Sequence, residues 1–220
     1  MLFDFGGTLA FLDYELLASE FSRRGPRIDA LQLEHSEYAG RRWIDEYLMR
    51  GSPPSGIGAY YDYFRAWMVA AGFPGDGVDE LRARFLEIHR AETLWRVVRP
   101  GIIEALARLK DAGLKLGVVS NAEGQVAGDA ERFGLAKFFD VIIDSHVVGV
   151  AKPDPRIFQI ALERLGVSAA ESVFAGDIYS IDVLGARAAG IDAAVIDQHG
   201  RYDWIEHRRI RHVRELHLLD

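Results

Sequence analysis

The sequence has no cysteine among its 220 residues, and it uses several polar residue types sparingly. The absence of cysteine excludes disulfides, thiolate zinc sites and cysteine nucleophiles, and it fits a reducing compartment. Lysine occurs four times, threonine twice and asparagine once. Because these residue types are so rare, the positions at which they do occur carry more weight in the search for a functional site.

Long apolar runs and strongly basic segments are also scarce. No stretch approaches the roughly 20 apolar residues that span a bilayer, and no charged segment followed by an apolar one marks a signal peptide. The net charge is −7, and the basic run at residues 208–211 is short. We therefore expect a cytoplasmic protein that binds neither nucleic acid nor membrane, with this basic run on the solvated surface. Whether it is a monomer or a homodimer stays open from the sequence.

The second half of the chain repeats one simple unit. A helical pattern of apolar residues ends at a glycine, and a short strand follows it. Four strands are expected after such glycines, and a fifth opens the chain: 1–5, 114–119, 138–143, 172–175 and 193–196. Because strands and helices alternate, the sequence predicts an α/β fold whose core is a Rossmann-like parallel sheet covered on both faces.

Residues 13–95 interrupt this pattern. They contain no convincing strand and about four helical stretches, which are separated near residues 25–26, 51–58 and 72–77. Six of the eight tyrosines and three of the four tryptophans lie in this segment. We interpret it as an inserted helical domain whose aromatic residues mostly fill its own core. The α/β core then comprises residues 1–12 and 96–220.

Four polar motifs lie where ligands collect in an open parallel sheet, beyond the carboxyl ends of the strands. Asp4 follows the first expected strand, and Ser120 follows the second. Lys152 comes after the third strand and Asp177 directly after the fourth, with Asp182 five residues further on. Carboxylates suit Mg²⁺ and can also attack phosphorus. A hydroxyl, a lysine and glycine-exposed amides can neutralise a phosphoryl group.

In their order and spacing, these motifs are similar to those of the haloacid dehalogenase superfamily. The segments are Asp-Phe-Gly-Gly-Thr-Leu, Ser-Asn, Lys-Pro-Asp-Pro-x-x-Phe and Gly-Asp-x-x-x-x-Asp, beginning at residues 4, 120, 152 and 176. Residues 149–190 resemble phosphatase-like members most, and residues 13–95 resemble the type-1 helical cap. Each motif alone is a weak signal, but the resemblance covers nearly the whole chain.

The resemblance implies a Mg²⁺-dependent phosphohydrolase that acts on a small phosphorylated molecule. Asp4 is then the nucleophile and a metal ligand. Gly6 offers its backbone carbonyl to the ion, and Asp177 completes the protein ligands. Asp182 lies behind them or binds through water.

The same resemblance assigns the phosphoryl group to a second set of residues. Ser120 and the amide of Asn121 hold its oxygens, and Lys152 neutralises the charge of the phosphoryl group and the nucleophile. Thr8 braces the first loop. The cap selects the substrate, and the sequence does not rank its polar candidates, which are Arg41, Arg42, Arg50 and Tyr60.

Structural roles compete with these assignments. Asp4 and Ser120 could be turn residues, and Lys152 could be an ordinary loop lysine. Asp177 could cap the helix that follows it, and Asp182 could lie on the solvated face of that helix.

The sequence departs from the phosphatase pattern at Gly6. Most phosphatases of the superfamily have an aspartate there, which protonates the leaving group and then activates water. Loss of such a general acid/base costs about 10²–10⁴-fold in rate. One reading is a phosphatase with weakened or rerouted proton transfer, acting best on good leaving groups or with help from the substrate. A second is a silent protein that binds a phosphorylated ligand or a partner.

Two other reactions of the superfamily also proceed without that aspartate. Dehalogenases need neither a metal nor the acids of the last motif, so the presence of Asp177 and Asp182 argues against dehalogenation. Phosphonatase-like members use a lysine of the cap, and residues 13–95 contain none.

Overall fold

The computed structural model describes residues 1–53 and 57–218, and the chain divides into two compact units. The α/β unit comprises Met1–Phe11, Arg96–Gly200 and Ile205–Asp220. The helical unit comprises Leu12–Trp95 and the short segment Arg201–Trp204. The predicted core of residues 1–12 and 96–220 includes residues 201–204, whereas in the structure these belong to the helical unit.

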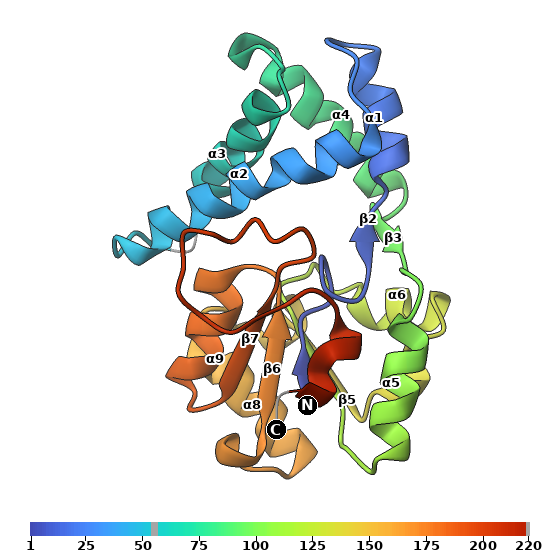
Figure 1. Cartoon of the computed structure of the whole chain (residues 1–220), viewed down its shortest axis with the longest axis vertical. Helices are drawn as coiled ribbons and strands as arrows, with labels where there is room; N and C mark the ends of the chain where they lie inside the picture. The colour runs from blue at the N-terminus through green and yellow to red at the C-terminus, as the bar shows by residue number, and fades with distance from the viewer. Residues whose placement is uncertain (54–56, 219–220) are drawn as a thin grey trace. The chain divides into compact units, whose positions relative to one another are not determined.

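A six-stranded parallel sheet forms the centre of the α/β unit (Figure 1). The strands run in the order β5-β4-β1-β6-β7-β8. Their bounds are β1 Leu2–Phe3, β4 Gly117–Ser120, β5 Val141–Asp144, β6 Val173–Gly176, β7 Asp192–Ile196 and β8 Arg209–Ile210. The predicted α/β class is therefore confirmed, with β1 in the interior of the sheet between β4 and β6.

Helices cover both faces of this sheet (Figure 1). The bounds are α5 Ile102–Asp111, α6 Val126–Arg132, α7 Ser145–Val148, α8 Pro155–Leu165 and α9 Leu184–Ala188, with a π-helical turn η4 at Tyr179–Val183 and 3₁₀ turns η2 Ala136–Phe138, η3 Ala169–Glu171 and η5 Val213–Leu218. On one face, Leu106 of α5 and Ala130 of α6 pack in one cluster with Phe3 and Val118 of the sheet. On α8, the ring of Phe158 meets that of Phe174 of β6 at 5.1 Å between centroids. Burial on both faces explains why the strands read as short continuous apolar runs.

Several strands begin later than their sequence patterns suggest, because the first residues of the apolar run belong to the turn that precedes the strand. Gly113 has φ of 79°, and the next amide, Leu114 N, donates to Leu109 O at 3.1 Å to close the end of α5. This is the usual hydrogen bond after a left-handed glycine cap. Phe138 likewise belongs to the 3₁₀ turn η2 rather than to the strand that follows. Apolar character alone does not separate such capping residues from strand residues.

The basic run at residues 208–211 was predicted to be solvated surface, and this is only half right. Arg209 and Ile210 form β8 and pair in parallel with Val195 and Ile196 of β7. Arg209 is exposed, whereas Ile210 is 6% exposed and belongs to the core. A two-residue strand flanked by arginines gives too short an apolar signal to be identified from the sequence.

The helical unit contains α1 Tyr14–Ser22, α2 Ala30–Met49, α3 Ile57–Ala70, the 3₁₀ turn η1 Gly75–Gly77 and α4 Val78–Ala91. These four helices match the expected number, although residues 54–56 of the second predicted break lie outside the described residues. Trp67, at 1% exposure, lies in an aromatic core together with Tyr14, Phe21 and Phe64. Gly40 lets α2 and α3 approach closely, because a Cβ there would lie 2.8 Å from the carbonyl oxygen of Tyr63.

One short sheet at the ends of the inserted segment is absent from the sequence-based prediction. The strands β2 (Phe11–Leu12) and β3 (Trp95–Val97) pair with each other as a separate two-stranded sheet. They lie at the two positions where the chain passes between the units.

The segment 201–204 docks on one face of α2 within the helical unit. Tyr202 is fully buried, and its ring packs against Tyr38 with 6.0 Å between centroids. The indole Nε1 of Trp204 donates to Asp45 Oδ2 at 3.2 Å, and its ring lies beneath the guanidinium of Arg42. Because residues 38, 42 and 45 recur at helical spacing, a single stripe of α2 receives this segment.

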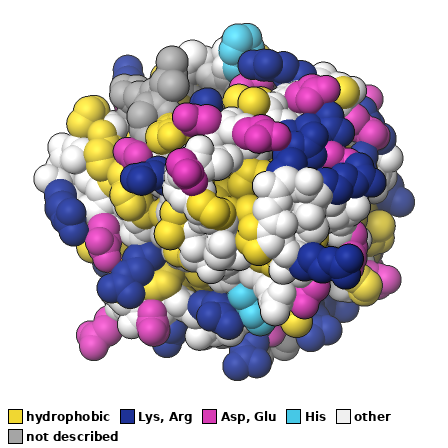
Figure 2. Space-filling view, turned by 90° about the horizontal axis from the view of Figure 1, so that it is seen from above, with side chains coloured by type: hydrophobic (Ala, Val, Ile, Leu, Met, Phe, Trp, Pro, Cys, Tyr) yellow, Lys and Arg dark blue, Asp and Glu magenta, His cyan; other side chains and the backbone are white. Residues whose placement is uncertain are grey.

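The exposed surface carries charges of both signs. Lys and Arg side chains lie beside Asp and Glu side chains over the face shown in Figure 2. Among the described residues, every helix is too short or too polar to cross a lipid bilayer.

The burial of Tyr202 leads to a stability prediction. Tyr202→Ala should lower the free energy of unfolding by about 3–5 kcal/mol, the usual cost of truncating a buried aromatic side chain. Tyr60→Ala is a matched control, since Tyr60 is 51% exposed and its truncation should cost less than about 0.5 kcal/mol. Urea unfolding measures both values, and equal costs would contradict an integral role for segment 201–204.

Candidate active site

Three of the predicted motifs begin at the carboxyl ends of adjacent strands. Asp4 directly follows β1, Ser120 is the last residue of β4, and Asp177 directly follows β6. Since β4, β1 and β6 are neighbours and run parallel, these residues lie at the same edge of the sheet. The amide of Asp4 is itself fixed to the sheet, donating to Ala175 O at 2.9 Å.

Lys152 joins the first motif to the last. Its Nζ donates to Asp4 Oδ1 at 2.5 Å and to Asp182 Oδ1 at 2.6 Å. All three residues are buried, with exposures of 3%, 6% and 1% for Lys152, Asp4 and Asp182. Buried charges are stable only when they are paired and hydrogen-bonded, so this arrangement fixes all three side chains.

Asp177 completes a cluster of three buried carboxyl groups. One oxygen from each of Asp4, Asp177 and Asp182 lies within 4.8 Å of the others. Two glycines make room for this cluster. A Cβ on Gly7 would lie 2.1 Å from Asp177 Oδ2, and a Cβ on Gly176 would lie 2.4 Å from Asp182 Cγ. Gly7 also has φ of 78°, a conformation that other residues rarely adopt.

Asp182 is held from two sides. It lies on the π-helical turn η4, where its amide donates to Ile178 O at 2.8 Å. Its Oδ2 accepts from the Ile178 amide at 2.9 Å, while Oδ1 accepts from Lys152. Both carboxylate oxygens are therefore engaged within the protein, which suits a residue that orients Lys152.

Burial and charge together set the protonation of this centre. Burial raises the pKa of Asp4 to about 6; Lys152 opposes the rise, and Asp182 adds to it. Burial alone would lower the pKa of Lys152, but Asp182 and Asp4 raise it above the ordinary lysine value. Lys152 is therefore an ammonium ion at neutral pH. Three carboxyl groups against one ammonium leave an excess of negative charge, and carboxylate oxygens are donors that fit a hard divalent cation such as Mg²⁺.

The remaining predicted residues belong to the first two strand-end motifs. Ser120 is buried, at 6% exposure. The side chain of Asn121 forms two hydrogen bonds with the backbone of Lys152, a contact that the sequence does not predict. The resemblance implied that Thr8 braces the first loop, but its buried Oγ1 has no hydrogen-bond partner among the described residues. Gly6 is half-buried, and its φ lies outside the left-handed region.

The four polar candidates of the helical unit are mostly paired within that unit. Arg41 is buried and donates to Glu37 Oε2 at 3.2 Å. Arg42 and Arg50 both donate to Glu46, at 2.9 and 3.2 Å. Tyr60 is 51% exposed. The three arginines are thus neutralised by glutamates of α2. A role for these four side chains in substrate selection stays a prediction.

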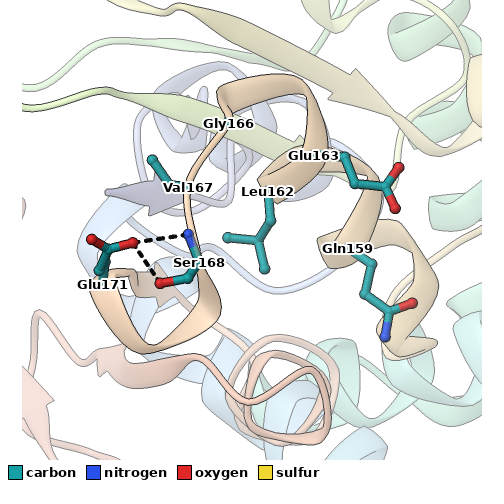
Figure 3. A pocket seen from close by; sticks show the side chains of 7 residues that line it. All are labelled: Gln159, Leu162, Glu163, Gly166, Val167, Ser168 and Glu171. Carbon is teal, nitrogen blue, oxygen red and sulfur yellow. Dashed lines mark hydrogen bonds between the residues drawn. The ribbon is translucent and has the colours of Figure 1, made fainter.

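A surface hollow of about 440 Å³ lies elsewhere on the α/β unit, between α8 and η3 (Figure 3). Its lining residue Glu171 accepts hydrogen bonds from the amide and the hydroxyl of Ser168. Both residues precede β6, whereas Asp177 follows that strand. The hollow therefore lies at the amino end of β6, apart from the carboxylate cluster.

Comparisons with known proteins agree with this geometry. A model of the haloacid dehalogenase-like hydrolase family matches residues 1–190. A glyceraldehyde 3-phosphate phosphatase of Methanopyrus kandleri is 38% identical over 112 residues, which cover 50% of this chain and 47% of that protein. A phosphoserine phosphatase of Thermus thermophilus is 34% identical over 140 residues, covering 61% and 53% of the two chains.

The fold agrees over a longer stretch than these sequence matches. The crystal structure of a phosphatase of the same superfamily from Thermococcus onnurineus has a TM-score of 0.60 and 28% identity, covering 99% of this chain and 95% of that one. The chain spans about half the length of the curated relatives it matches. The match over residues 1–190, with all four motifs inside it, shows that the chain belongs to the haloacid dehalogenase-like hydrolase family.

Proposed function

We propose that this chain is a Mg²⁺-dependent phosphohydrolase that acts on a small phosphorylated molecule. The observation that carries the proposal is the buried cluster at the sheet edge, in which Lys152 bridges Asp4 and Asp182 beside Asp177. Relatives named as phosphatases of glyceraldehyde 3-phosphate and of phosphoserine support the same reaction class.

In this proposal Asp4 is the nucleophile. One of its carboxylate oxygens attacks phosphorus, and the bond between phosphorus and the leaving oxygen breaks, with the electron pair going to that oxygen. Water then attacks the phosphorus of the aspartyl-phosphate, and the bond from Asp4 to phosphorus breaks. Inorganic phosphate is released, and the proton of the water passes to solvent.

The other residues neutralise and orient the reacting groups. Ser120 and the amide of Asn121 hold the phosphoryl oxygens, and Lys152 offsets their charge. Asp4, the carbonyl of Gly6 and Asp177 would hold Mg²⁺, which when bound supplies positive charge against the phosphoryl oxygens. Asp182 stays behind this group and fixes Lys152.

Gly6 shapes the substrate range in this proposal. Without an aspartate at this position, the leaving oxygen departs unprotonated or takes its proton from the substrate. Phosphate esters with good leaving groups, such as aryl or acyl phosphates, should therefore react faster than simple alkyl phosphates. The helical unit is proposed to act as the cap that selects the leaving group.

Gly6 also favours a second candidate function, a silent protein that binds a phosphorylated ligand or a partner. Metal and phosphate sites can serve binding alone. Turnover of an aryl phosphate with and without Mg²⁺ separates the two functions, because the silent protein gives none. Dehalogenation fits less well, since it needs neither Asp177 nor Asp182.

The first prediction concerns the metal. Since the pKa of Asp4 is raised to about 6, this carboxyl is protonated below that pH, and protons compete with Mg²⁺ for it. Affinity for Mg²⁺, measured by calorimetry, should fall about tenfold for each pH unit below the pKa. Asp177→Asn should weaken binding at every pH. Asp192→Asn is a control, because that carboxylate pairs with Arg208 and is exposed. Affinity indifferent to pH and to Asp177→Asn would overturn the metal assignment.

The second prediction concerns the nucleophile. Asp4→Asn keeps the size of the side chain and removes the attacking charge, so aryl phosphate turnover should fall to the uncatalysed rate. The protein should still fold, because Lys152 keeps Asp182 as its partner. Lys152→Ala should also abolish turnover, but it leaves two buried carboxylates unpaired at a cost of about 3–5 kcal/mol. If Asp4→Asn retained most of the activity, the aspartyl-phosphate mechanism would be wrong.

The third prediction restores the missing acid. Gly6 lies outside the left-handed region, so Gly6→Asp should be accommodated by the backbone. The gain should be larger for alkyl than for aryl phosphates and approach about 10²–10⁴-fold. Gly7→Ala is the contrasting control, because its Cβ would collide with Asp177 and destabilise the protein. A folded Gly6→Asp variant that, like wild type, turned over no phosphate ester would favour the silent protein.

A further inference from the structure

The side chain of Asn121 holds the backbone of Lys152 at two points. Its Nδ2 donates to Lys152 O at 2.9 Å, and its Oδ1 accepts from Lys152 N at 2.7 Å. The two residues are 31 positions apart in the sequence, so this contact fixes one strand-end loop to another. When one side-chain amide pairs with both the backbone N–H and the backbone C=O of another residue, it fixes the position and the orientation of that residue's backbone.

Lys152 depends strongly on this placement. Its Nζ must reach Asp4 and Asp182 simultaneously, at 2.5 and 2.6 Å, from a buried position. Each of these carboxylates is anchored by its own backbone, Asp4 to β6 and Asp182 to Ile178. A shift of the Lys152 backbone would therefore lengthen one hydrogen bond or both, since neither acceptor is free to follow.

The loop that carries Asn121 is braced separately from its other side. Ser145 Oγ accepts from Ala122 N at 3.2 Å and donates to Ala122 O at 3.1 Å. Asp144 accepts from Gly124 N at 3.0 Å. These contacts hold the loop to the end of β5, so the loop stays fixed when the Asn121 side chain is removed.

We propose that Asn121 is a positioning residue that sets Lys152 between the nucleophile and Asp182. Its backbone amide, proposed above to hold a phosphoryl oxygen, is a separate group that every substitution at this position retains. The side chain acts on the reaction through Lys152. This inference rests on the proposed function for its effect on turnover, but the placement of Lys152 itself can be measured without any substrate.

Four lysines make that measurement simple. A sample labelled with ¹⁵N-lysine has four ammonium groups, at Lys110, Lys115, Lys137 and Lys152. The Lys152 side chain is 2% exposed, against 32% for Lys110, so its ammonium hydrogens should exchange most slowly with water. Lys152→Arg assigns the signal, because it removes one resonance and keeps a positive charge.

Asn121→Ala should move the Lys152 signal and accelerate its hydrogen exchange by roughly tenfold or more, as expected for a local opening. Ser145→Ala is the matched control. It removes the same number of hydrogen bonds from the same loop, but Ser145 forms none of the hydrogen bonds that hold Lys152. The Lys152 signal should stay as in wild type in this variant. An unchanged Lys152 signal in a folded Asn121→Ala protein, or equal changes in both variants, would overturn the proposal.

Turnover of an aryl phosphate gives the second readout. Asn121→Ala should lower kcat by about 10²-fold, the cost of misplacing a group by roughly 1 Å, and should change KM much less. Ser145→Ala should stay close to wild type in both. A wild-type protein without turnover would contradict the proposed function and leave the lysine signal to decide the positioning role. A kcat unchanged in Asn121→Ala, in an active enzyme, would overturn that role.

Discussion

The structure depends on one buried interaction, the ammonium of Lys152 between the carboxylates of Asp4 and Asp182. The ammonium stabilises both buried carboxylates, because the desolvation of an ion is offset only by close and well-oriented partners. The three residues come from distant parts of the chain, so the ion group forms only when the first strand, the loop after β5 and the turn after β6 have assembled. The same contact therefore forms only in a correctly folded core, and it orients Asp4, the proposed nucleophile.

Space for this ion group comes from residues without side chains. Gly7 and Gly176 lie against Asp177 and Asp182, and a Cβ on Gly185 would lie 2.9 Å from Pro153 Cα. Each glycine lets backbone approach a charged group or its neighbour more closely than any other residue permits. Close packing around Lys152 therefore disfavours any side chain at these three glycines, although none of them takes part in the proposed chemistry.

Much of this site was predictable because its residues stand directly beside strands that can be recognised from short stretches of sequence. Asp4, Ser120 and Asp177 lie at strand ends that short apolar runs mark, and neighbouring parallel strands bring such ends to one edge. The contact of the Asn121 side chain with the Lys152 backbone was not predictable in the same way. The two residues are 31 positions apart, and the contact depends on the conformations of two loops. Strand β8 was missed because its single buried residue, Ile210, lies among arginines. Leu114 was assigned to a strand because capping and pairing both favour an apolar residue.

The segment 201–204 changes what counts as a domain in this chain. A helical insert that is one continuous segment, joined to the core by two linkers, can in principle be transferred to another protein as a single piece of sequence. Here the helical unit is built from two separate pieces of sequence, and the smaller piece supplies the fully buried Tyr202. If the gene were cut at the ends of the inserted segment, the helical product would lack Tyr202 and expose the face of α2 around Tyr38. The α/β product would keep Tyr202 without its packing partner. Exchange of this unit between relatives therefore requires that both pieces move together.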